Sequence, residues 1–156
     1  MFNLHIIVLG KIKESYWREA INEYLKRLKP YGKIKITEMH EESFRDIGEK
    51  EQVKIKEADK IKKQIAPGSL VIACDEHGRK FSSEEFALFL KEHSQHGDVI
   101  TILLGGPLGL HESILELARH TISLSRLTFP HQLARIILLE QIYRAATIIA
   151  RKQYHY

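Results

Sequence analysis

Residues 98–104 read DVITILL, and residues 105–109, GGPLG, follow them without a break. The apolar run is continuous rather than alternating, which predicts a strand covered on both faces of a sheet. Glycines at its end let the backbone take positive φ angles and let a ligand approach closely. The stretch therefore predicts a core strand that leads into either a tight strand-to-helix turn or a ligand-binding loop, and the spacing alone leaves both open.

Further strands and helices are predicted on both sides of this stretch. Similar apolar runs at residues 69–74 (SLVIAC) and 4–9 predict two more buried strands. A half-exposed strand is predicted at 33–38, and a short strand at 121–124. Residues 39–48 are rich in charge and predict a loop. Apolar residues at helical spacing predict helices at 14–28, within 53–65, at about 111–119 and at 131–151. A further helix is predicted to begin after a capping box formed by Ser82 and Glu85.

The alternation of strands and helices predicts an α/β fold with a mostly parallel sheet and helices on both faces. A length of 156 residues suits a single domain, residues 1–156. Ligands in such sheets bind beyond the carboxyl ends of the strands. Residues 75–78, 105–109 and 125–130 are expected there, so we predict the functional site where these three segments converge.

Several classes of protein are excluded by composition. The single cysteine, Cys74, rules out an intrachain disulfide and a cysteine-based zinc site, and it fits a reducing, cytoplasmic compartment. The histidines show no shared ligand spacing, so no metal is predicted. The most apolar long stretch, residues 133–150, contains Arg135, Glu140 and Arg144, which argues against a membrane span.

The net charge of +4 is unevenly distributed. Residues 113–156 hold six basic and two acidic side chains, residues 11–35 hold eight and three, and residues 36–112 hold ten and fifteen. The chain therefore has two basic regions separated by an acidic one. Such local basic regions favour a polyanionic partner without proving one.

Residues 123–131 (SLSRLTFPH) have no regular periodicity. Their backbone groups could read the edge of a heterocycle while Leu127 and Phe129 pack on its faces, or they form an ordinary loop that ends where a helix starts. His131 is a candidate base or else a structural histidine. Asp75 and Glu76 could act as an acid and a base, but neighbours on a strand point to opposite sides, which argues against this.

The last predicted helix is apolar almost all round, so we expect it to be covered on two sides, by the sheet and by a second subunit. Arg135 lies on its apolar side, where an unpaired charge is costly. It either reaches a site or partner beyond the helix or makes a buried ion pair. The tail residues Tyr154 and His155 either fray or stack on a nucleobase.

Several blocks along the whole chain resemble the RlmH-type methyltransferases of the SPOUT superfamily, which methylate N3 of a pseudouridine in large-subunit ribosomal RNA. The matching blocks are Val8-Leu9-Gly10-Lys11, Tyr24-Leu25-Lys26-Arg27, Asp75 with Gly78, Gly105-Gly106-Pro107-x-Gly109-Leu110, Ser123-Leu124-Ser125-x-Leu127-Thr128-x-Pro130-His131, Arg135, Glu140-Gln141-x-Tyr143-Arg144-Ala145 and Tyr154-His155.

The resemblance implies a C-terminal trefoil knot, a homodimer formed through the last helix, and S-adenosylmethionine as methyl donor. The substrate would be pseudouridine 1915 of 23S rRNA, within the assembled 70S ribosome. Catalysis would involve His131 as base and Arg135 as the group that stabilises charge, while Tyr154 and His155 hold the flipped base. The implied donor site consists of Cys74, Gly105, Gly106, Leu124, Ser125, Arg126, Leu127, Thr128 and Phe129.

Other functions compete with this interpretation. One is a different SPOUT activity, on tRNA or at a ribose oxygen. Another is a ribosome-associated binding protein without catalysis. A dehydrogenase or a flavodoxin-like domain is disfavoured, because the glycines lack the GxGxxG spacing that holds dinucleotide phosphates and the acidic residue that binds the ribose is missing. The absence of a GxxxxGK[ST] loop likewise disfavours an ATP phosphate site.

Overall fold

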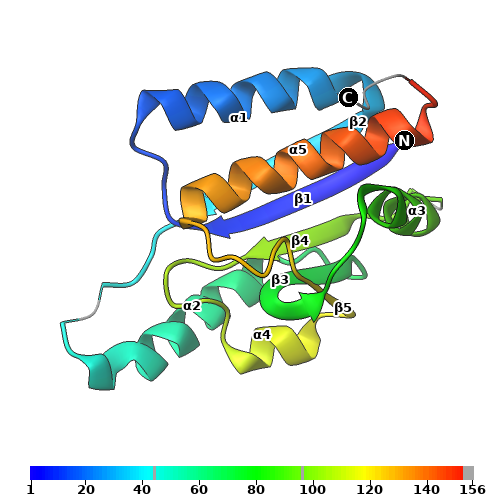
Figure 1. The fold of residues 1–156 in the computed structure, drawn as a ribbon. Helices are drawn as coiled ribbons and strands as arrows, with labels where there is room; N and C mark the ends of the chain where they lie inside the picture. The colour runs from blue at the N-terminus through cyan, green and yellow to red at the C-terminus, as the bar shows by residue number, and fades with distance from the viewer. Residues whose placement is uncertain (44, 96, 153–156) are drawn as a thin grey trace.

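A computed structural model describes residues 1–43, 45–95 and 97–152 of the chain. Strands and helices alternate along it, as predicted (Figure 1). The strands are β1 (Phe2–Leu9), β2 (Gly32–Met39), β3 (Leu70–Arg79), β4 (Ile100–Leu104) and β5 (His120–Ile122). The helices are α1 (Ser15–Leu28), α2 (Lys50–Gln64), α3 (Ser83–His93), α4 (Glu112–Leu117) and α5 (His131–Ile149), with 3₁₀ turns at Lys29–Tyr31 and Ile47–Glu49.

In the described ranges the strands form one five-stranded sheet in the order β2-β1-β4-β3-β5. Every neighbouring pair is parallel, which confirms the predicted mostly parallel sheet. β4 lies at the centre, where Ile100 is opposite both Leu4 of β1 and Leu70 of β3. All of β4 is buried, as its continuous apolar run requires.

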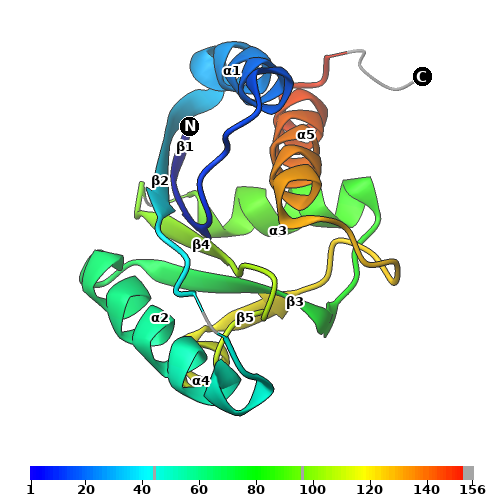
Figure 2. The ribbon, with the colours of Figure 1, turned by 90° about the vertical axis from the view of Figure 1, so that its left-hand side faces the viewer.

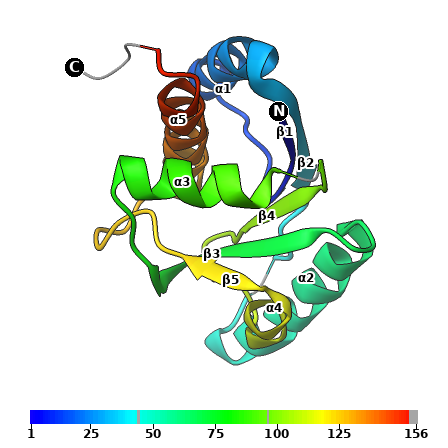
Figure 3. The same cartoon turned by 90° about the vertical axis from the view of Figure 1, so that its right-hand side faces the viewer.

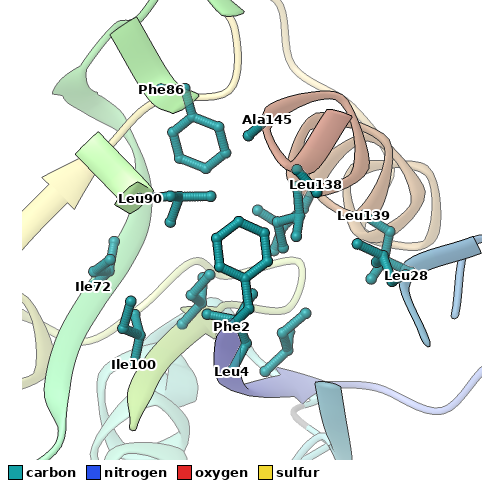
Figure 4. Close-up of a cluster of buried hydrophobic side chains, with 14 of the residues drawn as sticks. Phe2, Leu4, Leu28, Ile72, Phe86, Leu90, Ile100, Leu138, Leu139 and Ala145 are labelled. Atoms are coloured by element: carbon teal, nitrogen blue, oxygen red, sulfur yellow. The ribbon is translucent and has the colours of Figure 1, made fainter. Parts of the chain in front are cut away.

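Helices cover both faces of the sheet, again as predicted. α1, α3 and α5 lie on one face, and α2 and α4 lie on the other (Figures 2 and 3). Neighbouring residues of β1 point to opposite faces of the sheet. Ile6 belongs to the cluster packed with α1, α3 and α5, whereas Ile7 belongs to the cluster packed with α2 and α4. The larger cluster includes Phe2, Leu4, Leu28, Ile72, Phe86, Leu90, Ile100, Leu138 and Leu139 (Figure 4).

The surroundings of α5 differ in part from the expectation. The helix contacts both α1 and α3 and buries Leu138, Leu139 and Ile142 completely. Two helices of the same chain therefore supply cover that we expected from a second subunit. Leu133 and Ile137 remain only partly buried.

β3 is longer than the sequence predicted. We placed residues 75–78 in a loop after the strand, but β3 continues to Arg79. Its far end pairs with β5 after an irregularity in register, so that Arg79 is opposite Ile122. A Cβ atom on Gly78 would lie 2.5 Å from the carbonyl carbon of Ile122, so glycine allows this close approach. The extension depends on a tertiary contact with β5 and not on local apolar character.

Local signals at helix ends behave as expected. The side chain of Ser82 accepts a hydrogen bond from the Glu85 N–H, and the Glu85 carboxylate accepts one from the Ser82 N–H, which confirms the predicted capping box at α3.

None of the helices in the described residues combines the length and the apolar character that crossing a bilayer requires.

Candidate functional site

A cleft of about 880 Å³ opens at the carboxyl ends of β3 and β4. This volume falls within the ~300–1,000 Å³ of typical small-molecule pockets. Its walls come mainly from the end of β3, from residues 104–110 at and after the end of β4, and from residues 123–131, which lead from β5 into α5. Lys54 of α2, Glu112 and Leu115 of α4, and Ala134 of α5 also line it. The segments 75–78, 105–109 and 125–130 do converge, and of these only Gly78 and Arg126 lie outside the lining.

The loop after β4 folds back on itself. The Gly109 N–H donates to the Gly106 carbonyl at 3.0 Å, and Gly109 has a φ of +72°. A Cβ atom on Gly105 would lie 2.8 Å from the carbonyl carbon of Gly109. The glycines therefore make a tight turn whose backbone also lines the cleft, so the two interpretations of this motif are compatible.

Side-chain hydrogen bonds shape the loop between β5 and α5. The Ser123 hydroxyl donates to the Ser125 carbonyl at 2.9 Å, and the Ser125 hydroxyl accepts from the Leu127 N–H at 2.9 Å. The Leu127 side chain is 74% exposed at the edge of the cleft. An exposed apolar side chain beside a cleft is available to pack on a ligand.

The structure brings together most of the residues predicted to bind the donor. Arg126 is exposed and is the one member of that set outside the lining. The members that line the cleft are Cys74, Gly105, Gly106, Leu124, Ser125, Leu127, Thr128 and Phe129. They come from three segments that are far apart in the sequence but meet at one edge of the sheet.

The end of β3 also brings acidic groups to the cleft. Asp75 and Glu76 both line it, although regular strand alternation would separate them. The register irregularity between Cys74 and Arg79 accounts for this difference. Burial, together with the Asp75 charge, raises the pKa of the Cys74 thiol to about 12, so this thiol is neutral under ordinary conditions.

His131, the candidate base, lies at the first residue of α5 and lines the cleft. Its Nε2 atom is 3.3 Å from the Oε1 atom of Glu41, and the two side chains are 20% and 35% exposed. Glu41 is not among the site residues that the sequence pattern predicted. Residues around it are dense in charge, and no local pattern indicates which carboxylate turns toward α5.

Arg135 makes the buried ion pair that was one of its two predicted arrangements. Its side chain is 1% exposed and pairs with Glu38 of β2, whose side chain is 36% exposed. Its Nη2 atom also donates to the Gly10 carbonyl at 2.9 Å. Burial lowers the pKa of the guanidinium, while Glu38 acts in the opposite direction. Arg135 is not among the residues that line the cleft, so in this arrangement its guanidinium is engaged by Glu38 and Gly10 and not by the cleft.

Two predicted site residues, Tyr154 and His155, lie outside the described residues. Within the described ranges, no group of three or more histidine, cysteine, aspartate or glutamate side chains is arranged to hold a metal ion.

Comparison with known proteins identifies the class. The chain belongs to the SPOUT methyltransferase family, because the family model described as "Predicted SPOUT methyltransferase" matches residues 2–155. The resemblance noted in the sequence is thereby confirmed. A crystal structure of a probable methyltransferase from Bordetella pertussis Tohama I has the same fold, with a TM-score of 0.59 and 14% identity over 93% of this chain and 95% of that one.

The curated relatives carry a more specific name, "Ribosomal RNA large subunit methyltransferase H". The relative from Carboxydothermus hydrogenoformans is 47% identical over 154 residues, which is 96% of this chain and 97% of the relative. The relative from Clostridium acetobutylicum is 41% identical over 157 residues, or 98% of this chain and 99% of the relative. Similarity to these relatives therefore extends over nearly the whole chain.

Proposed function

We propose that this protein is an S-adenosylmethionine-dependent methyltransferase that methylates N3 of a pseudouridine in 23S rRNA, at position 1915, on the assembled ribosome in the cytoplasm. The observation that carries the proposal is the cleft at the carboxyl ends of β3 and β4 in a chain of the SPOUT family. The names of the relatives support rRNA as the substrate. We further propose that residues 1–156 form one SPOUT-type domain with a C-terminal trefoil knot.

The residues of the cleft fit a methyl donor of this kind. Backbone groups of Gly105 and Gly106 can approach a ligand because these residues carry no side chain, and Leu124 and Phe129 supply apolar surface for a flat ring. We assign donor binding to Cys74, Gly105, Gly106 and residues 124–129. When bound, S-adenosylmethionine supplies an electrophilic methyl group.

The main chemical task of the chain's own residues is to remove the N3 proton of the pseudouridine. The imide N3–H of pseudouridine is a weak acid, and the neutral nitrogen is a poor nucleophile. His131 borders the cleft and takes this proton as general base. Arg135, one helical turn further along α5, supports the negative charge that develops on the flanking carbonyls. Because Arg135 is engaged by Glu38, this role requires its guanidinium to turn toward the cleft.

The proposal includes a homodimer. The partly buried Leu133 and Ile137 give α5 an apolar side that a second copy could cover. In this arrangement Tyr154 and His155 of one subunit hold the flipped nucleobase at the cleft of the other. The modest charge of +4 per chain suits recognition of a shaped target better than extensive contact with phosphates.

The test is an incubation of the protein with labelled S-adenosylmethionine and either 70S ribosomes or free 23S rRNA, followed by mass spectrometry of the modified nucleotide. We expect N3-methylpseudouridine from ribosomes and little product from free rRNA. Equal activity on free rRNA would overturn the ribosome requirement. Methylation of tRNA or of a ribose oxygen would replace the proposed substrate, and calorimetry without donor binding would support a non-catalytic protein.

A further inference from the structure

A hollow at the end of β1 receives two side chains from distant parts of the chain. Gly10 follows β1 with a φ of +90° and has no side chain of its own. A Cβ atom at this position would lie 2.2 Å from Oε1 of Glu41 and 3.0 Å from Nε2 of His131. The loop after β2 and the first turn of α5 therefore meet in the space that the missing side chain leaves.

Glu41 lies close to both His131 and the glycine loop of the cleft. Its Oε1 atom is 3.3 Å from Nε2 of His131. A Cβ atom on Gly106 would lie 3.6 Å from Cγ of Glu41, an ordinary contact distance. The two atoms are within ion-pair distance, and because a carboxylate can only accept from a neutral imidazole, a hydrogen bond between them requires the tautomer with the proton on Nε2. The lone pair of Nδ1 is then free to accept another proton.

The loop that carries Glu41 is anchored on both sides of this residue. The Gly10 N–H donates to the carbonyl of Met39 at 2.8 Å. The Glu42 N–H donates to the buried Glu57 carboxylate at 2.9 Å, and the Glu42 carboxylate pairs with Lys60. A charged residue held between two such anchors can fix the orientation of a neighbour. The other nearby charges, Arg135 and Glu38, are paired with each other.

We propose that Glu41 is a positioning residue for the methyl transfer proposed above. It accepts the Nε2–H of His131, fixes the ring and its tautomer, and leaves Nδ1 as the atom that takes the proton from the imide. In that step the N3–H bond breaks, its electron pair stays on the pseudouridine, and a new N–H bond forms at Nδ1. The imidazolium that results is stabilised by the Glu41 carboxylate. The substrate named in this inference depends on the proposed function, whereas the tautomer of His131 does not.

The tautomer can be measured without any activity. We would record ¹⁵N spectra of histidine-labelled protein at a pH where the imidazoles are neutral, for the wild type and for Glu41→Ala. The wild type should show the proton of His131 on Nε2, and Glu41→Ala should lose this preference. His111 serves as an internal reference, because its Nδ1 accepts from the Ser113 N–H at 3.1 Å and its Nε2 lies 3.0 Å from Glu51.

The matched control is Glu51→Ala, which removes a carboxylate from the His111 pair and leaves the cleft intact. We expect Glu41→Ala to slow single-turnover methylation of ribosomes at least ~10-fold, as part of the ~10²- to 10⁴-fold that a positioned base contributes. Donor affinity by calorimetry should stay unchanged in both variants, and Glu51→Ala should keep the wild-type rate. Glu41→Asp, which restores the charge, should recover part of the loss.

The proposal is overturned if His131 carries its proton on Nδ1 in the wild type, or if Glu41→Ala changes neither tautomer nor rate. A changed tautomer with an unchanged rate also overturns the positioning role. Failure of the proposed function has a different signature, because wild-type protein would then methylate no ribosomal pseudouridine while the Nε2–H tautomer of His131 could still be observed.

Discussion

Arg135 of α5 donates a hydrogen bond to the carbonyl of Gly10, across a separation of 125 residues in sequence, with an Nη2–O distance of 2.9 Å. The same guanidinium pairs with Glu38 of β2, so one buried side chain joins the start of α5 to the ends of two strands. Its Nε atom is buried and has no hydrogen-bond partner among the described residues. The position of α5 beside the cleft therefore depends on a buried, paired charge.

We expect Arg135→Met to lower the free energy of unfolding by about 2–4 kcal/mol, because it leaves the Glu38 carboxylate and the Gly10 carbonyl without their shared partner. Urea denaturation measures this loss. Glu23→Gln, which breaks an exposed pair with Arg27, is the control and should cost far less, because solvent screens an exposed pair. Arg135→Lys should slow methyl transfer more than it weakens RNA binding; equal losses would contradict the proposed role in charge stabilisation.

Gly105→Ala and Gly106→Ala should have different consequences. The added Cβ atom of the first would lie 2.8 Å from backbone of Gly109, whereas that of the second would lie 3.4 Å from the Leu9 side chain, which is ordinary contact. We expect Gly105→Ala to cost about 1–3 kcal/mol of stability and Gly106→Ala less than ~0.5 kcal/mol. Thermal denaturation checks this order, and stability losses of equal size would contradict it.

Because Gly106→Ala should leave the fold intact, it isolates ligand contact from stability. If the backbone of Gly106 approaches the donor closely, calorimetry should show weaker S-adenosylmethionine binding in this variant. Unchanged affinity in a folded Gly106→Ala protein would remove Gly106 from the donor site.

Glu57 and Glu42 should contribute to stability with opposite dependence on pH. Burial raises the pKa of the Glu57 carboxyl, so the folded protein holds the carboxyl proton more tightly than the unfolded chain does. The contribution of Glu57 to the free energy of unfolding therefore falls as the pH rises from the pKa of the unfolded state through that of the folded state. We therefore expect Glu57→Gln to stabilise the protein at pH 7 and to have no effect once the carboxyl is protonated in both states. Urea denaturation at pH 7 and at about pH 3, below the ordinary pKa of glutamate, measures the difference.

Glu42 provides the comparison of opposite sign. A hydrogen bond to Lys60 lowers the pKa of the Glu42 carboxylate, so its contribution is present above the unfolded pKa and is lost as pH falls through the folded one. Glu42→Gln should destabilise at pH 7 and lose its effect in acid. If both variants respond to pH in the same direction, the described environment of this loop is incorrect.

Cys74 should react slowly with thiol reagents even though it borders the cleft. Its pKa is raised from 9.0 to about 12, which lowers the thiolate fraction at pH 7 by roughly 10³-fold. Since Cys74 is the single cysteine, a chromogenic disulfide reagent reports on it directly. Native protein should react much more slowly than protein in guanidinium chloride, and comparable rates would contradict the raised pKa of this thiol.

The sequence was most informative where local pattern and burial agree. Continuous apolar runs predicted β1 and β4 because strands covered on both faces need no alternation, and the Ser82 capping box predicted the start of α3. The glycine loop was predicted at the cleft because ligands in parallel sheets bind beyond the strand ends, and this placement depends only on the order of elements.

What the sequence could not provide are contacts between distant residues. Arg135 was left with two alternatives because its partner, Glu38, is 97 positions away. The extension of β3 through a charged segment depends on Gly78 meeting the backbone of Ile122. Glu41 stands among many charged residues, and only the hollow at Gly10 distinguishes it from its neighbours. Each of these depends on tertiary geometry rather than on residue type.

The central place of β4 has a consequence for synthesis of the chain. Domains begin to fold from the N-terminus as they leave the ribosome. β1 and β2 can pair as soon as residue 39 has emerged, but the other edge of β1 stays open until residues 100–104 arrive. An open strand edge is a template for wrong pairing, so the nascent chain must pass through a long interval in which it needs protection. The cleft is completed only when the loop after β5 and the first turn of α5 have emerged, because both line it, so its walls come from segments that are made far apart in time.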